Sequence, residues 1–354
     1  PAVQTVDVPA NGRARVDWWV TVENVTSVDP LFSADGGGLS DSTRLESGPL
    51  PVLRYASPQT FATGGLLAEA GERLEVVSLP RTYTPTGGSL KVELTPSLAA
   101  SILEGLEALE TEFPADSTEQ TLSLLLPNLA AYRALTQLNL NAPDLGPRLS
   151  ATISAQLRRL MPLQREDGGF GWYLGDSTSR AHISAYALIT LAEARDLGFF
   201  NNQTALDNLT NYLFTNFFEP NEQTAAWQMD QLAFLAYAVA RARPQPDPSV
   251  DYATAALTNR QEMLSPWARA LLAQTLNLTY PGDERIRDLV SNLQSGAIRS
   301  ATGASWDSSD PATRQQNWAT AGYNTAVVSY VLAKIDPAAA VLPDAVRYLV
   351  LSRR

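Results

Sequence analysis

The chain has 354 residues, of which 45% are hydrophobic and 18% charged, a composition typical of globular proteins that excludes a disordered chain. It has no cysteine and a single histidine, His182, which excludes disulfides, thiolate metal sites and any site built from several histidines. A formal net charge of −11, with Lys91 and Lys334 as the only lysines, argues against nucleic acid or anionic lipid as a partner.

The length predicts at least two domains, because one domain typically takes about 100–200 residues. The sequence has no apolar run of the roughly 18 residues that span a bilayer. The chain begins with Pro1 rather than Met, and we expect it to be part of a longer polypeptide.

The first 96 residues carry a β-type pattern. Polar and apolar residues alternate over 3–7, 13–18, 73–77 and 90–94, which predicts antiparallel strands. Glycine and proline clusters separate these runs, among them Gly36-Gly37-Gly38. A further break at residues 49–51 predicts two β pieces rather than one.

From Pro96 onward the apolar periodicity is helical. A helix is expected after an N-cap at Ser97, and further helices are expected at 118–139, 147–161, 181–197, 204–217, 224–242, 266–278, 283–295, 312–335 and 344–352. Segments 183–194, 231–240 and 322–333 resemble one another and are apolar nearly all round. Repeated hairpins of one buried and one amphipathic helix favour a closed α/α toroid, with an open solenoid as the alternative.

Ser117 and Gln120 precede a long apolar helix with the spacing of a capping box. In that motif the serine hydroxyl accepts a first-turn amide hydrogen, and the glutamine side chain reaches back to the serine backbone. Glu119 also suits the positive end of the helix dipole. Capping by itself accounts for this segment.

A glycine-rich turn lies between two helices at Asp167-Gly168-Gly169-Phe-Gly-Trp172. It is not a phosphate loop, because it has no P-loop lysine and does not follow a strand. We interpret it as a structural turn that closes a helical hairpin. A similar turn occurs at 304–310.

His182 and several aspartates are the remaining candidates for chemistry. His182 begins a helix and is either packed there or a base whose nucleophile the sequence does not identify. Two carboxylates on a toroid could hydrolyse a glycoside, but most are expected to cap helices. The aspartates are Asp167, Asp176, Asp230, Asp307 and Asp310.

The chain resembles the bacterial alpha-2-macroglobulin family. The resemblance lies first in Phe113-Pro-x-x-Ser117-x-Glu119-Gln120-Thr and the Leu-Pro that follows, which are similar to the family's thioester segment. It continues in Leu163-Gln-x-x-Asp-Gly-Gly-Phe-Gly-Trp172 and the Ser-Ala-Tyr-Ala-Leu of the next helix. The N-terminal 55 residues are similar to the end of a macroglobulin β-sandwich.

This resemblance implies an α+β multidomain fold, in which β-sandwich and CUB-like pieces precede a large all-α α/α toroid. Residues 1–55 would end a macroglobulin-like sandwich, 56–96 form a CUB-like β segment, and 97–354 form the thioester-type domain. The resemblance also implies that Ser117 replaces the family's reactive cysteine beside the Glu119 and Gln120 pair. An alkoxide leaves less readily than a thiolate, so we expect no thioester and no covalent trapping.

The function implied by the resemblance is that of a non-covalent protease-trapping inhibitor and not an enzyme. Its partners would be proteases and neighbouring macroglobulin domains, the fragment would be a monomer, and no cofactor or metal is expected. The full-length protein would be periplasmic or on the cell surface, anchored to a membrane. The family has another helix after the one ending near Arg354, so we expect an apolar groove near this end.

Two other functions remain open from the sequence. One is an α/α-toroid enzyme, a glycosidase or a cyclase, because the Asp167 turn also resembles the repeat of triterpene cyclases. Those cyclases need an Asp-x-Asp-Asp acid, which this sequence lacks. The other is a scaffold that acts only through its surface.

Overall fold

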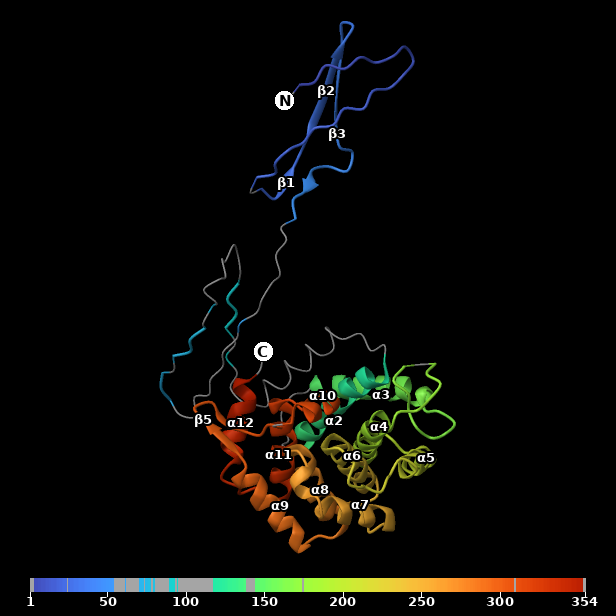
Figure 1. Cartoon of the computed structure of the whole chain (residues 1–354), viewed down its shortest axis with the longest axis vertical. Helices are drawn as coiled ribbons and strands as arrows, with labels where there is room; N and C mark the ends of the chain where they lie inside the picture. Colours follow the sequence, from blue (N-terminus) through green and yellow to red (C-terminus); the bar gives the residue numbers. More distant parts are fainter. Residues whose placement is uncertain are drawn as a thin grey trace. The chain divides into compact units, whose positions relative to one another are not determined.

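The structure is a computed structural model that describes residues 3–53 except 24, the positions 61, 70–72, 74–77, 79, 89–92 and 94, then 117–137, 144–308 except 174, and 310–352. The chain divides into two units, Pro1–Thr60 and Phe61–Arg354 (Figure 1). The predicted helix after Ser97 lies outside the described residues, as does most of the predicted CUB-like segment 56–96.

The N-terminal unit contains two short antiparallel ladders. β2 (Leu31–Gly36) pairs with β3 (Leu39–Arg44), and β1 (Ser27–Val28) pairs with β4 (Leu50–Pro51). The turn between β2 and β3 has positive φ angles at Gly37 and Gly38, which explains the glycines there. Every residue of β2 and β3 is exposed.

The described residues of the strands predicted over 73–77 and 90–94 lie in no strand, and the strands predicted over 3–7 and 13–18 are also wrong. These residues belong to no hydrogen-bonded ladder among the residues that the structure describes. Alternation indicates which face of a strand would be buried, but a strand forms only where another strand supplies its hydrogen bonds. The described part of this unit supplies partners only to residues 27–51.

Helices dominate the second unit. Those described are α2 (Thr118–Gln137), α3 (Leu145–Leu160), α4 (Ala181–Asp196), α5 (Gln203–Phe214), α6 (Ala226–Ala242), α7 (Pro248–Thr258), α8 (Pro266–Thr279), α9 (Glu284–Ser295), α10 (Pro311–Asn317), α11 (Ala321–Ile335) and α12 (Leu342–Leu351). Short 3-10 helices at Met161–Leu163 and Gln261–Met263 and a β5–β6 hairpin (Ile298–Ser300, Gly303–Ser305) connect some of them. No described helix combines the length and the apolar character that crossing a membrane requires.

Buried and more exposed helices alternate along the chain. α2, α4, α6, α8 and α11 contact one another in that order, and each also packs against the next outer helix, α3, α5, α7, α9 or α12. In Figure 1, α5, α7 and α9 lie outside the central α4, α6 and α8. The inner helices are rich in alanine and leucine, because a helix packed on most sides needs small and apolar residues.

Two helix predictions are wrong. The single helix expected over 312–335 is two helices, α10 and α11, separated by a left-handed residue, Trp318, whose φ is 49°. The helix α7 was not expected, because prolines crowd the sequence before it. Pro248 occupies its first turn, where proline is tolerated, and the Asp247 side chain accepts hydrogen bonds from two first-turn amides.

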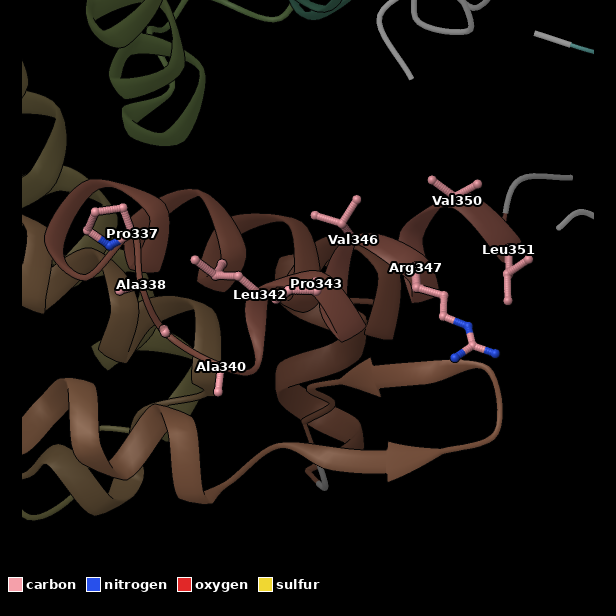
Figure 2. Close-up of a pocket in the computed structure, with 10 residues that line it drawn as sticks. Pro337, Ala338, Ala340, Leu342, Pro343, Val346, Arg347, Val350 and Leu351 are labelled. Atoms are coloured by element: carbon pink, nitrogen blue, oxygen red, sulfur yellow. The ribbon is translucent and has the colours of Figure 1, made fainter. Parts of the chain in front are cut away.

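An apolar groove of about 470 Å³ runs along α12 (Figure 2). The prediction of an apolar groove near this end of the chain is therefore confirmed. Its lining is Pro337, Ala338, Ala339, Ala340, Leu342, Pro343, Val346, Arg347, Val350 and Leu351.

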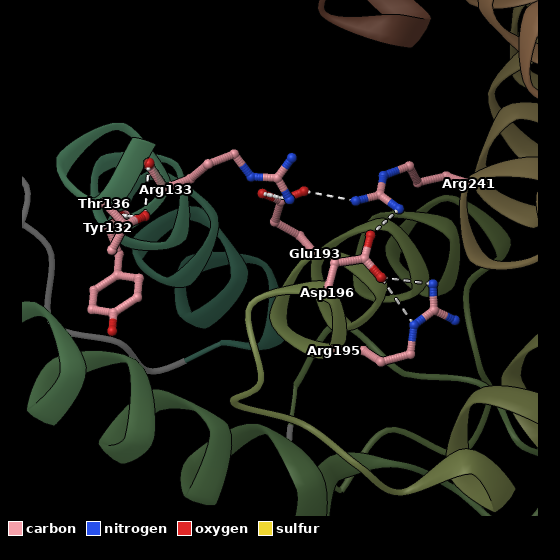
Figure 3. A network of polar contacts seen from close by, with 7 residues as sticks. All are labelled: Tyr132, Arg133, Thr136, Glu193, Arg195, Asp196 and Arg241. Carbon is pink, nitrogen blue, oxygen red and sulfur yellow. Dashed lines mark hydrogen bonds and ion pairs between the residues drawn. The ribbon is translucent and has the colours of Figure 1, made fainter. Parts of the chain in front are cut away.

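Ion pairs join the carboxyl ends of three inner helices (Figure 3). Glu193 on α4 accepts from Arg133 on α2 at 2.5 Å and from Arg241 on α6 at 2.8 Å. Arg241 also pairs with Asp196 at 2.7 Å. A positive charge near the carboxyl end of a helix interacts favourably with the negative end of the helix dipole. Arg133 and Arg241 therefore stabilise the helices that carry them.

Candidate functional site

Ser117 and Gln120 form a reciprocal pair at the start of α2. The Gln120 amide donates to Ser117 Oγ at 3.1 Å, and the Ser117 amide donates to Gln120 Oε1 at 3.1 Å. These are the hydrogen bonds of a capping box. Ser117 is only 6% exposed. The side-chain amide of the half-buried Gln120 is therefore held against a buried residue 117.

The Glu119 side chain contacts other residues than Gln120 does. Its carboxylate accepts a hydrogen bond from Ser123 Oγ at 2.6 Å, and Ser123 Oγ lies 3.5 Å from the hydroxyl of Tyr186 on α4. Burial raises the pKa of Tyr186, and the nearby Glu119 charge acts in the same direction. Glu119 thus ties the first turns of α2 to α4.

The turn at Asp167 is held by hydrogen bonds to the Asp167 carboxylate and packs closely against neighbouring backbone. Asp167 Oδ1 accepts from the Gly169 amide at 3.0 Å and from Ser179 Oγ at 2.7 Å. Gly168 has a φ of +87°, and a Cβ atom there would lie 2.4 Å from the carbonyl oxygen of Asn208. Side chains are excluded at this position both by conformation and by space.

This turn also reaches the start of α2, so two motifs far apart in sequence meet. The Thr118 amide donates to the Trp172 carbonyl at 2.9 Å. The Trp172 amide in turn donates to Asp176 Oδ2 at 2.6 Å, which fixes the end of the turn. Ser117 and Trp172 are thereby placed side by side.

An aromatic cluster surrounds Trp172. Its ring lies 5.5 Å from the ring of His182 and 5.8 Å, edge to face, from the ring of Trp318. The pKa of His182 is lowered, first because these neighbours desolvate its ring and second because Arg180 is close. The ring of His182 therefore lies against this cluster from an exposed position at the start of α4, with no serine nucleophile among its described contacts.

The candidate aspartates accept hydrogen bonds from backbone amides or form ion pairs with arginine. Asp176 holds the Trp172 amide, and Asp310 caps α10 through the amides of Ala312 and Thr313. Asp307 pairs with Arg314 at 2.9 Å. Of the five candidate aspartates only Asp310 caps a helix, so the expectation that most of them are helix caps is wrong. Among the residues that the structure describes, no group of acids or histidine is arranged to hold a metal ion.

Trp318 was not found by sequence reasoning. No glycine or proline occurs between Pro311 and Gly322, so the sequence carries little sign of the helix break that brings its ring to Trp172 and His182. Asn317, which precedes it, is the only local signal, because asparagine often stands where a helix ends. The contact links a late segment of the chain to an early one.

The described geometry joins a serine-glutamine helix start, a glycine-rich turn and repeated helical hairpins. A family model described as the A-macroglobulin TED domain matches residues 93–342. The chain belongs to this family. The match spans α2, the Asp167 turn and the following helices as far as the first residue of α12, so the site described above lies wholly within the A-macroglobulin TED domain.

Solved structures of bacterial alpha-2-macroglobulins have a similar fold. Native Escherichia coli alpha-2-macroglobulin seen by cryo-EM gives a TM-score of 0.55 at 18% identity, covering 72% of this chain and 16% of that one. An E. coli structure from domain MG7 to the C-terminus gives 0.53 at 17%, covering 71% and 38%. Salmonella alpha-2-macroglobulin reacted with methylamine gives 0.53 at 19%, covering 73% and 16%. This chain therefore corresponds to less than two fifths of each of these relatives.

Proposed function

We propose that this chain is part of a bacterial alpha-2-macroglobulin-like inhibitor that traps proteases without a covalent bond. The observation that carries the proposal is the Ser117–Gln120 pair, held together at the start of α2 within an A-macroglobulin TED domain. One similar structure is E. coli alpha-2-macroglobulin activated by porcine elastase, which supports proteases as the partner class. The proposal includes no enzymatic activity, metal or cofactor.

The chemistry at position 117 decides between covalent and non-covalent action. A cysteine here could attack the side-chain carbonyl carbon of Gln120, form a C–S bond and release ammonia, which carries away the thiol proton. A serine hydroxyl has a far higher pKa than a thiol, whose ordinary value is about 8.5. It is therefore a weaker nucleophile at neutral pH, and the ester would be a poorer acyl donor. Trapping must then rest on enclosure of the protease by a conformational change.

The remaining domain assignments belong to the same proposal. Residues 1–55 would complete a macroglobulin-like β-sandwich, since two-stranded ladders with exposed faces do not form a core by themselves. Residues 56–96 would be the CUB-like segment, and 97–354 would form an α/α toroid. The contact of Trp318 with Trp172 supports a ring, because it joins the last hairpins to the first. A periplasmic or cell-surface location follows from the family.

The mass of the Ser117→Cys variant tests the site. If Gln120 is poised as an acyl donor, the intact variant should be lighter than its sequence mass by one ammonia molecule. It should then gain one methylamine on exposure to that amine. The unmodified chain should show neither change.

A matched control separates thioester formation from other losses of mass. The double variant Ser117→Cys with Gln120→Glu keeps the thiol but has no side-chain amide to lose. It should therefore show the full sequence mass and no gain of methylamine. A full-mass Ser117→Cys protein that is folded by circular dichroism would overturn the assignment of a thioester-type site.

A further inference from the structure

Asp230 is a carboxylate buried in the helical core. It lies on α6 with its side chain fully enclosed. Oδ1 accepts from the Ser265 amide at the start of α8, at 2.9 Å, and Oδ2 accepts from Asn317 Nδ2 at 3.3 Å. Asp230 thus joins α6 to two other helices, and within the described part of the chain it does so without an ion pair.

Asn317 is the last residue of α10 and is fixed to α6 at three points. Besides Asp230, its Nδ2 donates to the Trp227 carbonyl at 3.0 Å, and its Oδ1 accepts from Gln231 Nε2 at 3.2 Å. Both polar atoms of its amide are therefore engaged by one helix. This fixes the end of α10, and with it the backbone that enters residue 318.

Trp318 follows directly in the left-handed conformation, with a φ of 49°. For a residue other than glycine this costs about 1 kcal/mol, so its neighbours must hold it. Asn317 holds one side, and the fully buried Ala319 holds the other. The Trp318 ring remains 65% exposed, yet lies edge to face with Trp172 and near His182.

We propose that Asp230 and Asn317 form an acid-sensitive latch that sets the position of Trp318. An ionised Asp230 accepts hydrogen bonds on both oxygens. In a protonated Asp230 the oxygen that carries the proton is a much weaker acceptor, so the amide hydrogen bond to that oxygen is weakened. The longer bond, to Asn317, is the one lost. The end of α10 is then left with two of its three hydrogen bonds to α6, and Trp318 leaves its left-handed conformation and its contacts with Trp172 and His182.

The charges around Asp230 place the switch within an accessible pH range. Burial raises the pKa of Asp230 to about 6, against the opposing effect of its hydrogen bonds, and Asp310 on α10 acts in the same direction as burial. Arg269 on α8 and Tyr323 on α11 also face this carboxylate. The latch is therefore closed above a pH of about 6 and opens below it.

Tryptophan fluorescence and near-UV circular dichroism from pH 8 to pH 5 test the latch. The chain has seven tryptophans, so the signal of Trp318 is the difference between the wild-type chain and Trp318→Phe. This difference signal should change with a midpoint near pH 6. A difference signal that stays constant over this range would overturn the proposal.

Three variants identify the group that titrates. Asp230→Asn accepts on one oxygen at any pH, so it should give the acid form of the Trp318 signal even at pH 8. Asn317→Ala removes the other partner of the hydrogen bond, at a less buried position, and should also give the acid form of the Trp318 signal at pH 8 with an unchanged far-UV spectrum. This variant keeps the proposal testable if Asp230→Asn does not fold. His182→Gln should keep the transition. Loss of the transition in His182→Gln, or its survival in a folded Asp230→Asn or Asn317→Ala chain, would overturn the proposal.

Discussion

Gly168 lies at the tightest point of the turn between α3 and α4. Its φ of +87° favours glycine, and an added Cβ would lie 2.4 Å from the Asn208 carbonyl oxygen. Gly198 has a similar φ of +80°, but an added Cβ would meet nothing within 4 Å. Comparing alanine substitutions at the two glycines therefore separates the free-energy cost of a positive φ angle from the cost of a steric clash.

Gly168→Ala should destabilise the protein far more than Gly198→Ala. For Gly198→Ala we expect the conformational cost alone, about 1 kcal/mol in the free energy of unfolding. For Gly168→Ala the clash with a backbone carbonyl adds to it, giving about 3 kcal/mol. Urea unfolding of the two variants measures both values. Equal losses would show that the turn moves away from Asn208 at little cost.

At residue 117 the sequence predicted the hydrogen bonds with Gln120 but not the packing of the neighbouring turn. The Ser-x-x-Gln spacing by itself indicates a reciprocal cap, and both bonds are present. The spacing does not indicate that the Trp172 carbonyl takes the next amide, at Thr118. That contact joins residues 54 positions apart, so it depends on how the turn packs rather than on local preference.

Glu193 is the central acid of the element-scale network in Figure 3. Its carboxylate pairs with Arg133 and Arg241, so it connects α2, α4 and α6. Glu193 is 12% exposed and Arg241 13%. Such pairs are screened less than surface pairs, and breaking one leaves a poorly solvated charge.

Glu193→Gln should lower the free energy of unfolding by about 2 kcal/mol, between the values for surface and fully buried ion pairs. The control is the exposed pair of Arg299 with Asp344, whose side chains are 60% and 44% exposed. Arg299→Gln should change stability by less than about 0.5 kcal/mol. Chemical denaturation at low salt provides the comparison. If both variants lose the same small amount, the network does not hold the inner helices together.

The break between α10 and α11 shows where element prediction fails. Residues 312–321 contain no glycine or proline, and the apolar spacing over 312–335 favours one helix. The helix ends because Asn317 binds α6 instead of continuing the helical path. By contrast, the inner helices α4, α6 and α8 begin and end within two residues of the prediction, since their burial and their local preference agree.

At the scale of the whole molecule, the first unit has unusually little burial. Large apolar side chains such as Val3, Trp19 and Leu39 are at least 80% exposed. Its strands leave both faces uncovered, which fits a segment that packs against further strands. Under the proposed function these strands come from the rest of the macroglobulin-like sandwich that residues 1–55 complete.

This chain should not inhibit a protease when assayed by itself. Enclosure requires domains that move around the protease, and the chain corresponds to a small part of its structural relatives. At an equimolar ratio, trypsin and elastase should cleave a protein substrate at their normal rates. Denaturing gels should show no adduct between protease and chain. Inhibition by the chain alone would contradict the proposal of trapping by enclosure, and an adduct would contradict the non-covalent mechanism.

The sequence by itself determined the helical part of the fold, the capping pair at Ser117 and Gln120, and the family. These features follow from the spacing of residues that are close together in the sequence, so a single stretch of chain is enough to predict each of them. Only the tertiary structure decided that the Asp167 turn docks on α2, that Asp230 binds Asn317, and that Trp318 reaches Trp172. Each of these contacts joins residues 54 to 146 positions apart, so it forms only when the fold brings distant segments of the chain together.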